Sequence, residues 1–145
     1  MSLLWRIVSL LILVVLVAAC SSEAGDNSDS SNPQPANDAT VVAALPAGDP
    51  ENGAELWDQQ IQAVQSCATC HSLDGSSGIG PTMQGYSEVA GTRVEGESAE
   101  VYSYHSIVNP AAYLVQGYPN VMYTQYDSAL SDQQIADLIA YMLTL

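Results

Sequence analysis

The residues best suited to chemistry lie in one short stretch, Cys67-Ala68-Thr69-Cys70-His71. Two thiols separated by two residues could form a redox disulfide, supply half of a zinc site, or anchor a prosthetic group. A structural zinc site requires four ligands, commonly two cysteine pairs or cysteines with paired histidines, but no other cysteine remains in the domain and His105 is the only other histidine. A thioredoxin-like pair belongs beside a βαβ pattern, which this sequence lacks.

The histidine directly after the second cysteine favours the third possibility. In a chain that carries an export signal, Cys-x-x-Cys-His is typical of c-type haem attachment. The two thiols add to the vinyl groups of the porphyrin, and the adjacent histidine then reaches the iron from one side. We therefore predict one covalent haem c, held by Cys67, Cys70 and His71.

The second iron ligand must come from elsewhere in the chain, and a methionine is the best candidate. Met122 lies in a loop ahead of the last expected helix, where it can fold over the haem face opposite His71. Met83 follows His71 by only twelve residues, so we expect it to line the haem edge on the histidine side. Met142 fits the apolar stripe of the last helix, and His105 fits a surface or half-buried position. We predict His71 and Met122 as the iron ligands.

The N-terminus has the plan of a secretory signal. Arg6 precedes an apolar run, and small residues then lead to Cys20 in the ending Val-Ala-Ala-Cys. That ending is similar to the lipobox of bacterial lipoproteins, which implies that residues 1–19 are removed and that Cys20 carries lipid. An uncleaved transmembrane helix is the alternative. Either form predicts an exported domain, anchored to a membrane on its periplasmic or extracellular face.

Two regions of different composition follow the signal. Residues 20–45 are rich in Ser, Asn, Asp, Pro and Ala, so we expect a lipidated, disordered linker. Residues 46–145 form the folded domain. Asp49 and Pro50 suit a helix start, and Ser131 with Gln134 suits a capping box.

Periodic patterns predict the helices of this domain. Gly53, Trp57, Ile61 and Val64 share one helical face near its start. The segment 99–108 reads as a further helix, and residues 131–145 as the last one. No run alternates between apolar and polar residues, so we expect no sheet.

The charge of the chain limits its partners. Sixteen Asp and Glu residues face two basic residues, Arg6 and Arg93, and the formal net charge is −14. Nucleic-acid affinity depends on Lys and Arg at phosphates, so we exclude DNA and RNA as partners. A docking partner should be basic, or be contacted through apolar surface.

From about Gly53 to the C-terminus, the chain resembles the class I monohaem cytochromes c. The resemblance is carried by the first helix, the stretches CATCH and GIGPTMQGY, the Met122 loop and the last helix. Residues 89–122 are similar to the haem domain fused to the second subunit of some terminal oxidases. The copper-binding portion of such subunits is missing here.

This resemblance implies a small all-α cytochrome c fold, with three to five helices wrapped around one covalent haem and no significant sheet. It implies that Gly53 and Tyr141 mark the crossing of the terminal helices. It also implies that the Pro81 carbonyl accepts the ring N–H of His71, and thereby orients the ring. Three tyrosines are implied to line the pocket or reach a propionate: Tyr86, Tyr118 and Tyr123.

The activity implied by the resemblance is one-electron transfer, not enzymatic turnover of a small-molecule substrate. The expected partners are a quinol-oxidising complex, an oxidase or another carrier in a respiratory or photosynthetic chain. The protein could shuttle, or be a fixed subunit similar to the monohaem lipoprotein of alternative complex III. One alternative is a haem protein that binds gas or peroxide through a dissociable Met122. Another is an exported binding module whose cysteines form a disulfide.

Overall fold

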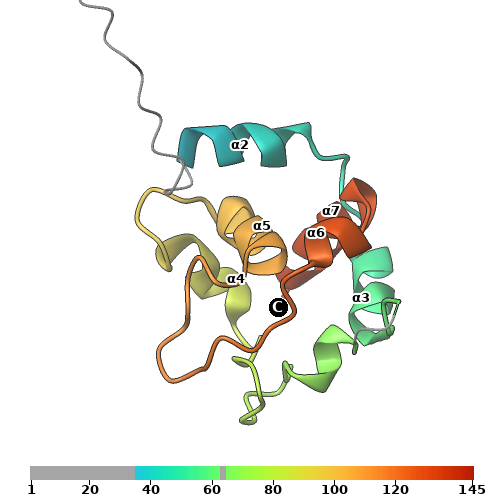
Figure 1. Ribbon diagram of the computed structural model, residues 1–145, viewed down its shortest axis with the longest axis vertical. Coiled ribbons are helices and arrows are strands. Elements are labelled where there is room, and N and C mark those ends of the chain that lie inside the picture. The colour runs from blue at the N-terminus through green and yellow to red at the C-terminus, as the bar shows by residue number, and fades with distance from the viewer. Residues whose placement is uncertain (1–34, 63–64) are drawn as a thin grey trace, which may run out of the picture. The chain divides into compact units, whose positions relative to one another are not determined.

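The computed structural model describes residues 35–62 and 65–145, which all belong to one unit, Pro33–Leu145. Six α-helices and two 3-10 turns form within these residues, and no strand does (Figure 1). The elements are α2 (Pro35–Ala44), α3 (Pro50–Asp58), η1 (Cys67–Thr69), α4 (Tyr86–Val89), η2 (Ala90–Thr92), α5 (Ala99–Val108), α6 (Tyr126–Ala129) and α7 (Asp132–Met142). The predicted all-α class is confirmed. The count exceeds three to five because α2 is helical and because α4 and α6 are single turns.

The helices α3 and α7 pack together near the start and end of the described chain. Asp49 caps α3 by accepting hydrogen bonds from the amides of Glu51 and Asn52. Ser131 and Gln134 form the predicted capping box at the start of α7. Gly53 lies against the backbone of α7, where a Cβ atom would overlap the carbonyl oxygen of Asp137. Only glycine lets the two helices approach so closely.

Helix α5 runs through the centre of the unit and matches the predicted residues 99–108. Ser98 caps it by accepting a hydrogen bond from the amide of Val101. Tyr102 and Ile107 of α5 join a core to which α7 contributes more aliphatic side chains than any other element. The core residues of α7 are Ile135, Leu138, Ile139 and Met142. Helices α5 and α7 thus supply much of the buried core against which the long loops pack.

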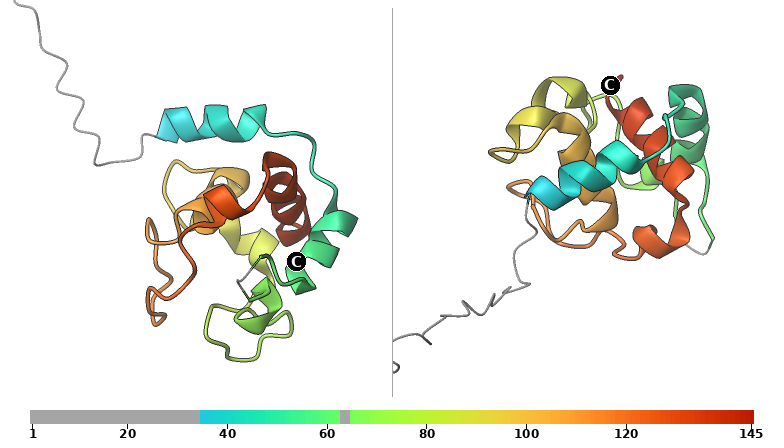
Figure 2. Two further views of the ribbon diagram at one scale, coloured as in Figure 1. Left: turned by 45° about the vertical axis from the view of Figure 1, so that its right-hand side comes forward. Right: turned by 90° about the horizontal axis from the view of Figure 1, so that it is seen from above.

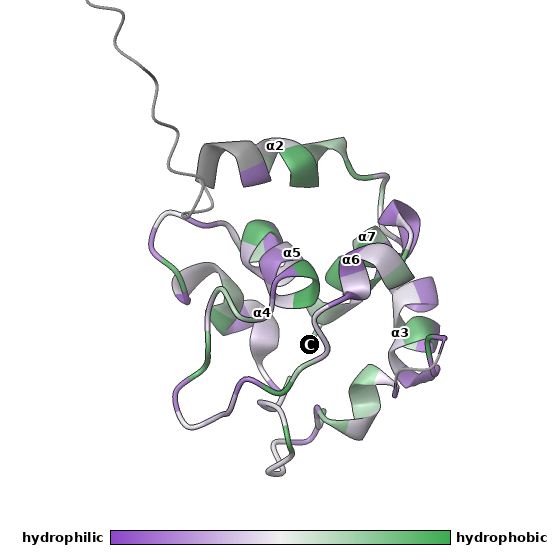
Figure 3. Cartoon of the chain, in the orientation of Figure 1, coloured by the Kyte–Doolittle hydropathy of each residue, from purple (hydrophilic) through white to green (hydrophobic). Residues whose placement is uncertain are grey.

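The linker prediction is wrong for residues 35–44, because they form α2, which packs across α5 (Figure 2). Figure 3 shows one strongly hydrophobic turn along this helix. Val42 and Leu45 are half-buried there, so the segment has some apolar surface to bury. The scarcity of apolar residues before this point led to the prediction of disorder. Residues 1–19 and Cys20 lie outside the described residues.

The predicted face of Gly53, Trp57, Ile61 and Val64 is wrong beyond Trp57, because α3 ends at Asp58. Ile61 is buried after the helix has ended, and Val64 lies outside the described residues. Glutamine favours helix, so Gln59 and Gln60 give no local signal that α3 ends at Asp58. Within the described part of the chain, no helix combines the length and hydrophobicity that crossing a bilayer requires.

Candidate functional site

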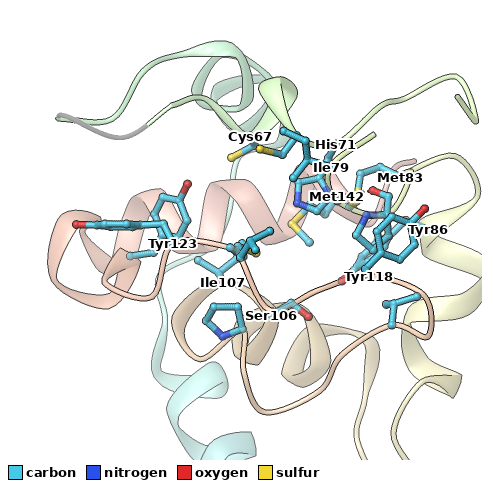
Figure 4. A pocket seen from close by; sticks show the side chains of 18 of the residues that line it. Cys67, His71, Ile79, Met83, Tyr86, Ser106, Ile107, Tyr118, Tyr123 and Met142 are labelled. Carbon is cyan, nitrogen blue, oxygen red and sulfur yellow. Dashed lines mark hydrogen bonds between the residues drawn. The ribbon is translucent and has the colours of Figure 1, made fainter. Parts of the chain in front are cut away.

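A cavity of about 420 Å³ lies between η1, α5, α7 and the loop of residues 109–125. Cys67, Cys70 and His71 all line it. Figure 4 shows Cys67 and His71 on one wall, with Ile107 and Ser106 on the facing side. The lining is mostly apolar and aromatic, and it gathers residues that lie up to 85 positions apart, from Trp57 to Met142.

The 3-10 turn η1 arranges the two thiols and the imidazole. The amides of Cys70 and His71 both donate to the carbonyl of Cys67, at 3.1 and 3.0 Å. This tight turn brings three side chains of five consecutive residues onto one cavity wall. Both cysteines are free thiols. Burial raises the pKa of Cys67 to about 11, so the free side chain stays a neutral thiol.

His71 is held in one orientation by the backbone. Its Nδ1 lies 2.8 Å from the carbonyl oxygen of Pro81, so Nδ1 carries the proton and donates it. The other nitrogen, Nε2, is thereby left with a free lone pair. Burial lowers the pKa of His71, while the hydrogen bond to Pro81 opposes this shift. The neutral ring that results is the form that ligates metals.

The loop that contains Pro81 fits closely around this ring. Gly80 donates its amide to the carbonyl of Cys70 at 2.9 Å, and a Cβ at Gly80 would lie 2.5 Å from Cε1 of His71. Trp57 contacts the ring from α3, with the ring centroids 6.0 Å apart. The side chain is therefore fixed by the backbone of one loop and by an aromatic ring of α3.

Three methionines line the cavity: Met83, Met122 and Met142. Met83 is buried, and its amide donates to the carbonyl of Ser72 at 2.7 Å, which ties it to the segment that follows His71. Met142 is buried on α7, as predicted. Met122 is half-buried, and it comes from the separate loop ahead of α6. The predicted tyrosines Tyr86, Tyr118 and Tyr123 also line the cavity.

Sequence reasoning missed Arg93, which is the only permanently charged side chain on the cavity lining. Burial raises the pKa values of Tyr86 and Tyr102, and the positive charge of Arg93 partly opposes this rise. The Tyr86 hydroxyl lies 2.9 Å from Oγ of Ser103. One signal was available: Arg93 is the only basic residue in a domain dominated by acids. Its place on the wall suits an anionic group of a bound molecule.

The other histidine takes no part in the cavity. His105 lies on α5, and it contacts Glu97 and Asp38. Across residues 35–62 and 65–145, no three His, Cys, Asp or Glu side chains form a group that could hold a metal ion. A zinc site is thus not formed by these residues.

The family model described as Cytochrome c matches residues 50–145. No curated protein matches the chain. Proteins of this family carry haem c attached covalently, and the cavity fits that group. Its lining includes two thiols, a neutral imidazole and the cation of Arg93, and is otherwise mostly apolar and aromatic. The cofactor of this chain is accordingly haem c, and its general role is haem-based electron transfer.

Proposed function

The chain belongs to the cytochrome c family, and we propose that it is a membrane-anchored carrier of single electrons with His71 and Met122 as iron ligands. Electron carriers, not enzymes, are the rule in this family. The observation that carries the proposal is the orientation of His71. Its Nδ1 is engaged by Pro81, so Nε2 is left as the ligating atom on the cavity side.

Met122 is the better partner for His71 because of where the methionines are attached. The amide of Met83 donates to the carbonyl of Ser72, the residue directly after His71. Met83 is therefore attached on the same side of the cavity as His71. Met122 comes from a loop with no such bond to that segment among the described residues. Haem held between a histidine and a methionine supplies reversible Fe(III)/Fe(II) chemistry at a raised potential.

The partner surface is proposed from the distribution of charge. Residues 59–73, 75–87 and 106–126 contain no Asp, Glu, Lys or Arg, although the whole chain has sixteen acidic residues. These three stretches supply most of the cavity lining. Ile79 and Val121, which belong to that lining, are 57% and 61% exposed. We propose that the redox partner contacts this uncharged face through apolar surface.

The setting of the protein is proposed from the N-terminus. The lipobox-like ending at Cys20 and the export signal support a lipoprotein, on the periplasmic or extracellular face. Residues 89–122 support a place in a respiratory or photosynthetic chain, next to a quinol-oxidising complex, an oxidase or another carrier. Replacing Cys20 with Ala should release the protein into the soluble fraction. Retention in the membrane would instead favour an uncleaved helix.

The ligand assignment is tested by two matched variants of the purified holoprotein, Met122→Ala and Met83→Ala. We expect Met122→Ala to remove the methionine–iron charge-transfer band and to lower the reduction potential, since the thioether favours ferrous iron. Met83→Ala should keep the band. Loss of the band in Met83→Ala alone would refute the assignment. A high-spin ferric spectrum in the wild type would favour the alternative role in binding gas or peroxide.

The partner surface is tested by placing a charge on it. Val121→Asp should slow electron exchange with the native membrane fraction and leave the absorption spectrum unchanged. Val41→Asp is the matched control, because Val41 is 42% exposed on α2 and does not line the cavity. Equal rates for the two variants would argue against docking at the uncharged face.

A further inference from the structure

His105 lies between two carboxylates that come from different parts of the chain. Its Nδ1 is 3.1 Å from Oε1 of Glu97, in the segment before α5, and this contact is a hydrogen bond. Its Nε2 is 3.1 Å from Oδ2 of Asp38, on α2. The second contact is an ion-pair distance without hydrogen-bond angles, and neither atom has another hydrogen-bonding partner.

This arrangement suits only a protonated ring. A neutral imidazole has one N–H and one lone pair. With its proton on Nδ1 for Glu97, the lone pair of Nε2 would face the carboxylate of Asp38 at 3.1 Å. Buried polar atoms without partners are costly, and this pair is buried. Protonation gives both nitrogens a proton and both carboxylates a cation.

Few side chains of α2 are buried where the structure describes them. Residues 38–44 contribute no side chain to the buried core, and among them only Asp38 and Val42 are half-buried. A helix of ten residues is too short to be stable alone, since isolated helices need about 12–15 residues. The chain after α2 is held separately, because Gln133 donates to the carbonyl of Ala47 at 2.9 Å. The packing against α5 is therefore an important support for α2.

We propose that His105 is a pH-dependent clamp, which holds α2 on α5 when protonated and releases it when neutral. Histidines ordinarily change charge between about pH 5 and pH 8. Glu97 lies eight residues from His105 on the same stretch of chain and stays nearby. Asp38 is the partner that can leave, so loss of the proton releases α2 and not Glu97.

The other ionisable groups around His105 strengthen this direction. Tyr104 is next to it, with the ring centroids 6.0 Å apart. Asp132 and Asp127, from the α6–α7 side, and Asp38 together help to raise the pKa of Tyr104, chiefly a result of burial. Arg93 lowers the pKa of Tyr102, whereas Glu97 raises it. Acids outnumber the one cation, so a neutral His105 would leave α2 facing net negative charge.

Release of α2 would change how far the domain can move from the membrane, a consequence that rests on the proposed N-terminal anchor. An α-helix rises about 1.5 Å per residue, whereas an extended chain spans at most about 3.4 Å per residue. Unfolding the ten residues of α2 would therefore lengthen the connection to the anchor by up to about 19 Å. The clamp itself depends on neither the lipid nor the haem ligands.

Amide hydrogen exchange of the full-length holoprotein tests the clamp, with rates corrected for their intrinsic pH dependence. In the wild type, protection of the α2 amides should fall about tenfold or more between about pH 5.5 and about pH 8.5. Protection in α7 and the haem spectrum should not change. His105→Gln should leave α2 unprotected at both pH values.

Glu97→Gln separates the clamp from a merely structural contact. An amide at position 97 can donate to Nδ1, so a neutral ring can keep its proton on Nε2 for Asp38. This variant should therefore protect α2 at both pH values. Glu100→Gln, on the exposed side of α5, is the control and should behave as the wild type. Equal protection of wild-type α2 at both pH values, or a pH-dependent loss in Glu97→Gln, would overturn the proposal.

Discussion

Replacement of Gly53 by alanine should destabilise the protein through the crossing of α3 and α7. The new Cβ would overlap the carbonyl oxygen of Asp137 and lie 2.7 Å from Cβ of Tyr141, whereas ordinary contacts begin near 3.4 Å. Overpacking costs about 1–3 kcal/mol, and alanine returns about 1 kcal/mol of helix propensity. Because the obstacle is backbone of a buried helix, we take the upper end and expect a net loss of about 2 kcal/mol.

Thermal unfolding of the ferric holoprotein, followed by circular dichroism, measures this loss. For a domain of this size, Tm changes by about 4–8 °C per kcal/mol, so Tm should fall by about 8–16 °C. Gly91→Ala is the matched control, because its Cβ would meet nothing closer than 3.5 Å, at the amide nitrogen of Ala99. If Gly53→Ala and Gly91→Ala unfold at the same temperature, the close approach does not constrain the fold.

Three further changes test the site. Gly80→Ala would place a Cβ 2.5 Å from Cε1 of His71, so the low-spin fraction of the ferric haem should fall, as seen by absorption spectroscopy, and Gly91→Ala should not change it. Burial raises the pKa of Tyr126 to about 12, so the folded protein keeps a proton that the unfolded chain loses above about pH 10. Stability should thus decline as pH rises from about 10 to 12, and Tyr126→Phe should make the urea midpoint less dependent on pH there; an unchanged slope would contradict this. His105→Gln should leave the reduction potential unchanged in voltammetry, because His105 does not line the cavity, and a shift like that of Met122→Ala would contradict this separation.

Local signals in the sequence were sufficient to predict where the helices with N-capping residues begin. The caps of Asp49 and Ser131 are formed as predicted, because a side-chain oxygen two or three residues ahead of free amides satisfies them regardless of the rest of the fold. The contact between His71 and Pro81 was implied by the family resemblance and not by the spacing, and in the structure Nδ1 of His71 lies 2.8 Å from the Pro81 carbonyl oxygen.

Contacts between distant segments could not be predicted from the sequence. The residue types after Asp58 give no signal for the early end of α3, and α2 packs against α5, which lies 55 or more residues further along the chain. The placement of Arg93 on the cavity wall depends on the same tertiary packing. The sequence thus predicted helix caps and the residues of the CATCH motif, whereas it did not predict which distant segments pack together.

Helix α5 connects the two sites while keeping them apart. Successive residues of an α-helix point about 100° apart, so neighbours can face different surroundings. His105 faces Asp38 of α2, whereas Ser106 and Ile107 line the cavity. Tyr102, one turn before Ser106, also lines the cavity, and Ser103 next to it is fully buried. If α2 is released as proposed, the reach of the proposed N-terminal tether would change without movement of the cavity wall formed by Ser106 and Ile107.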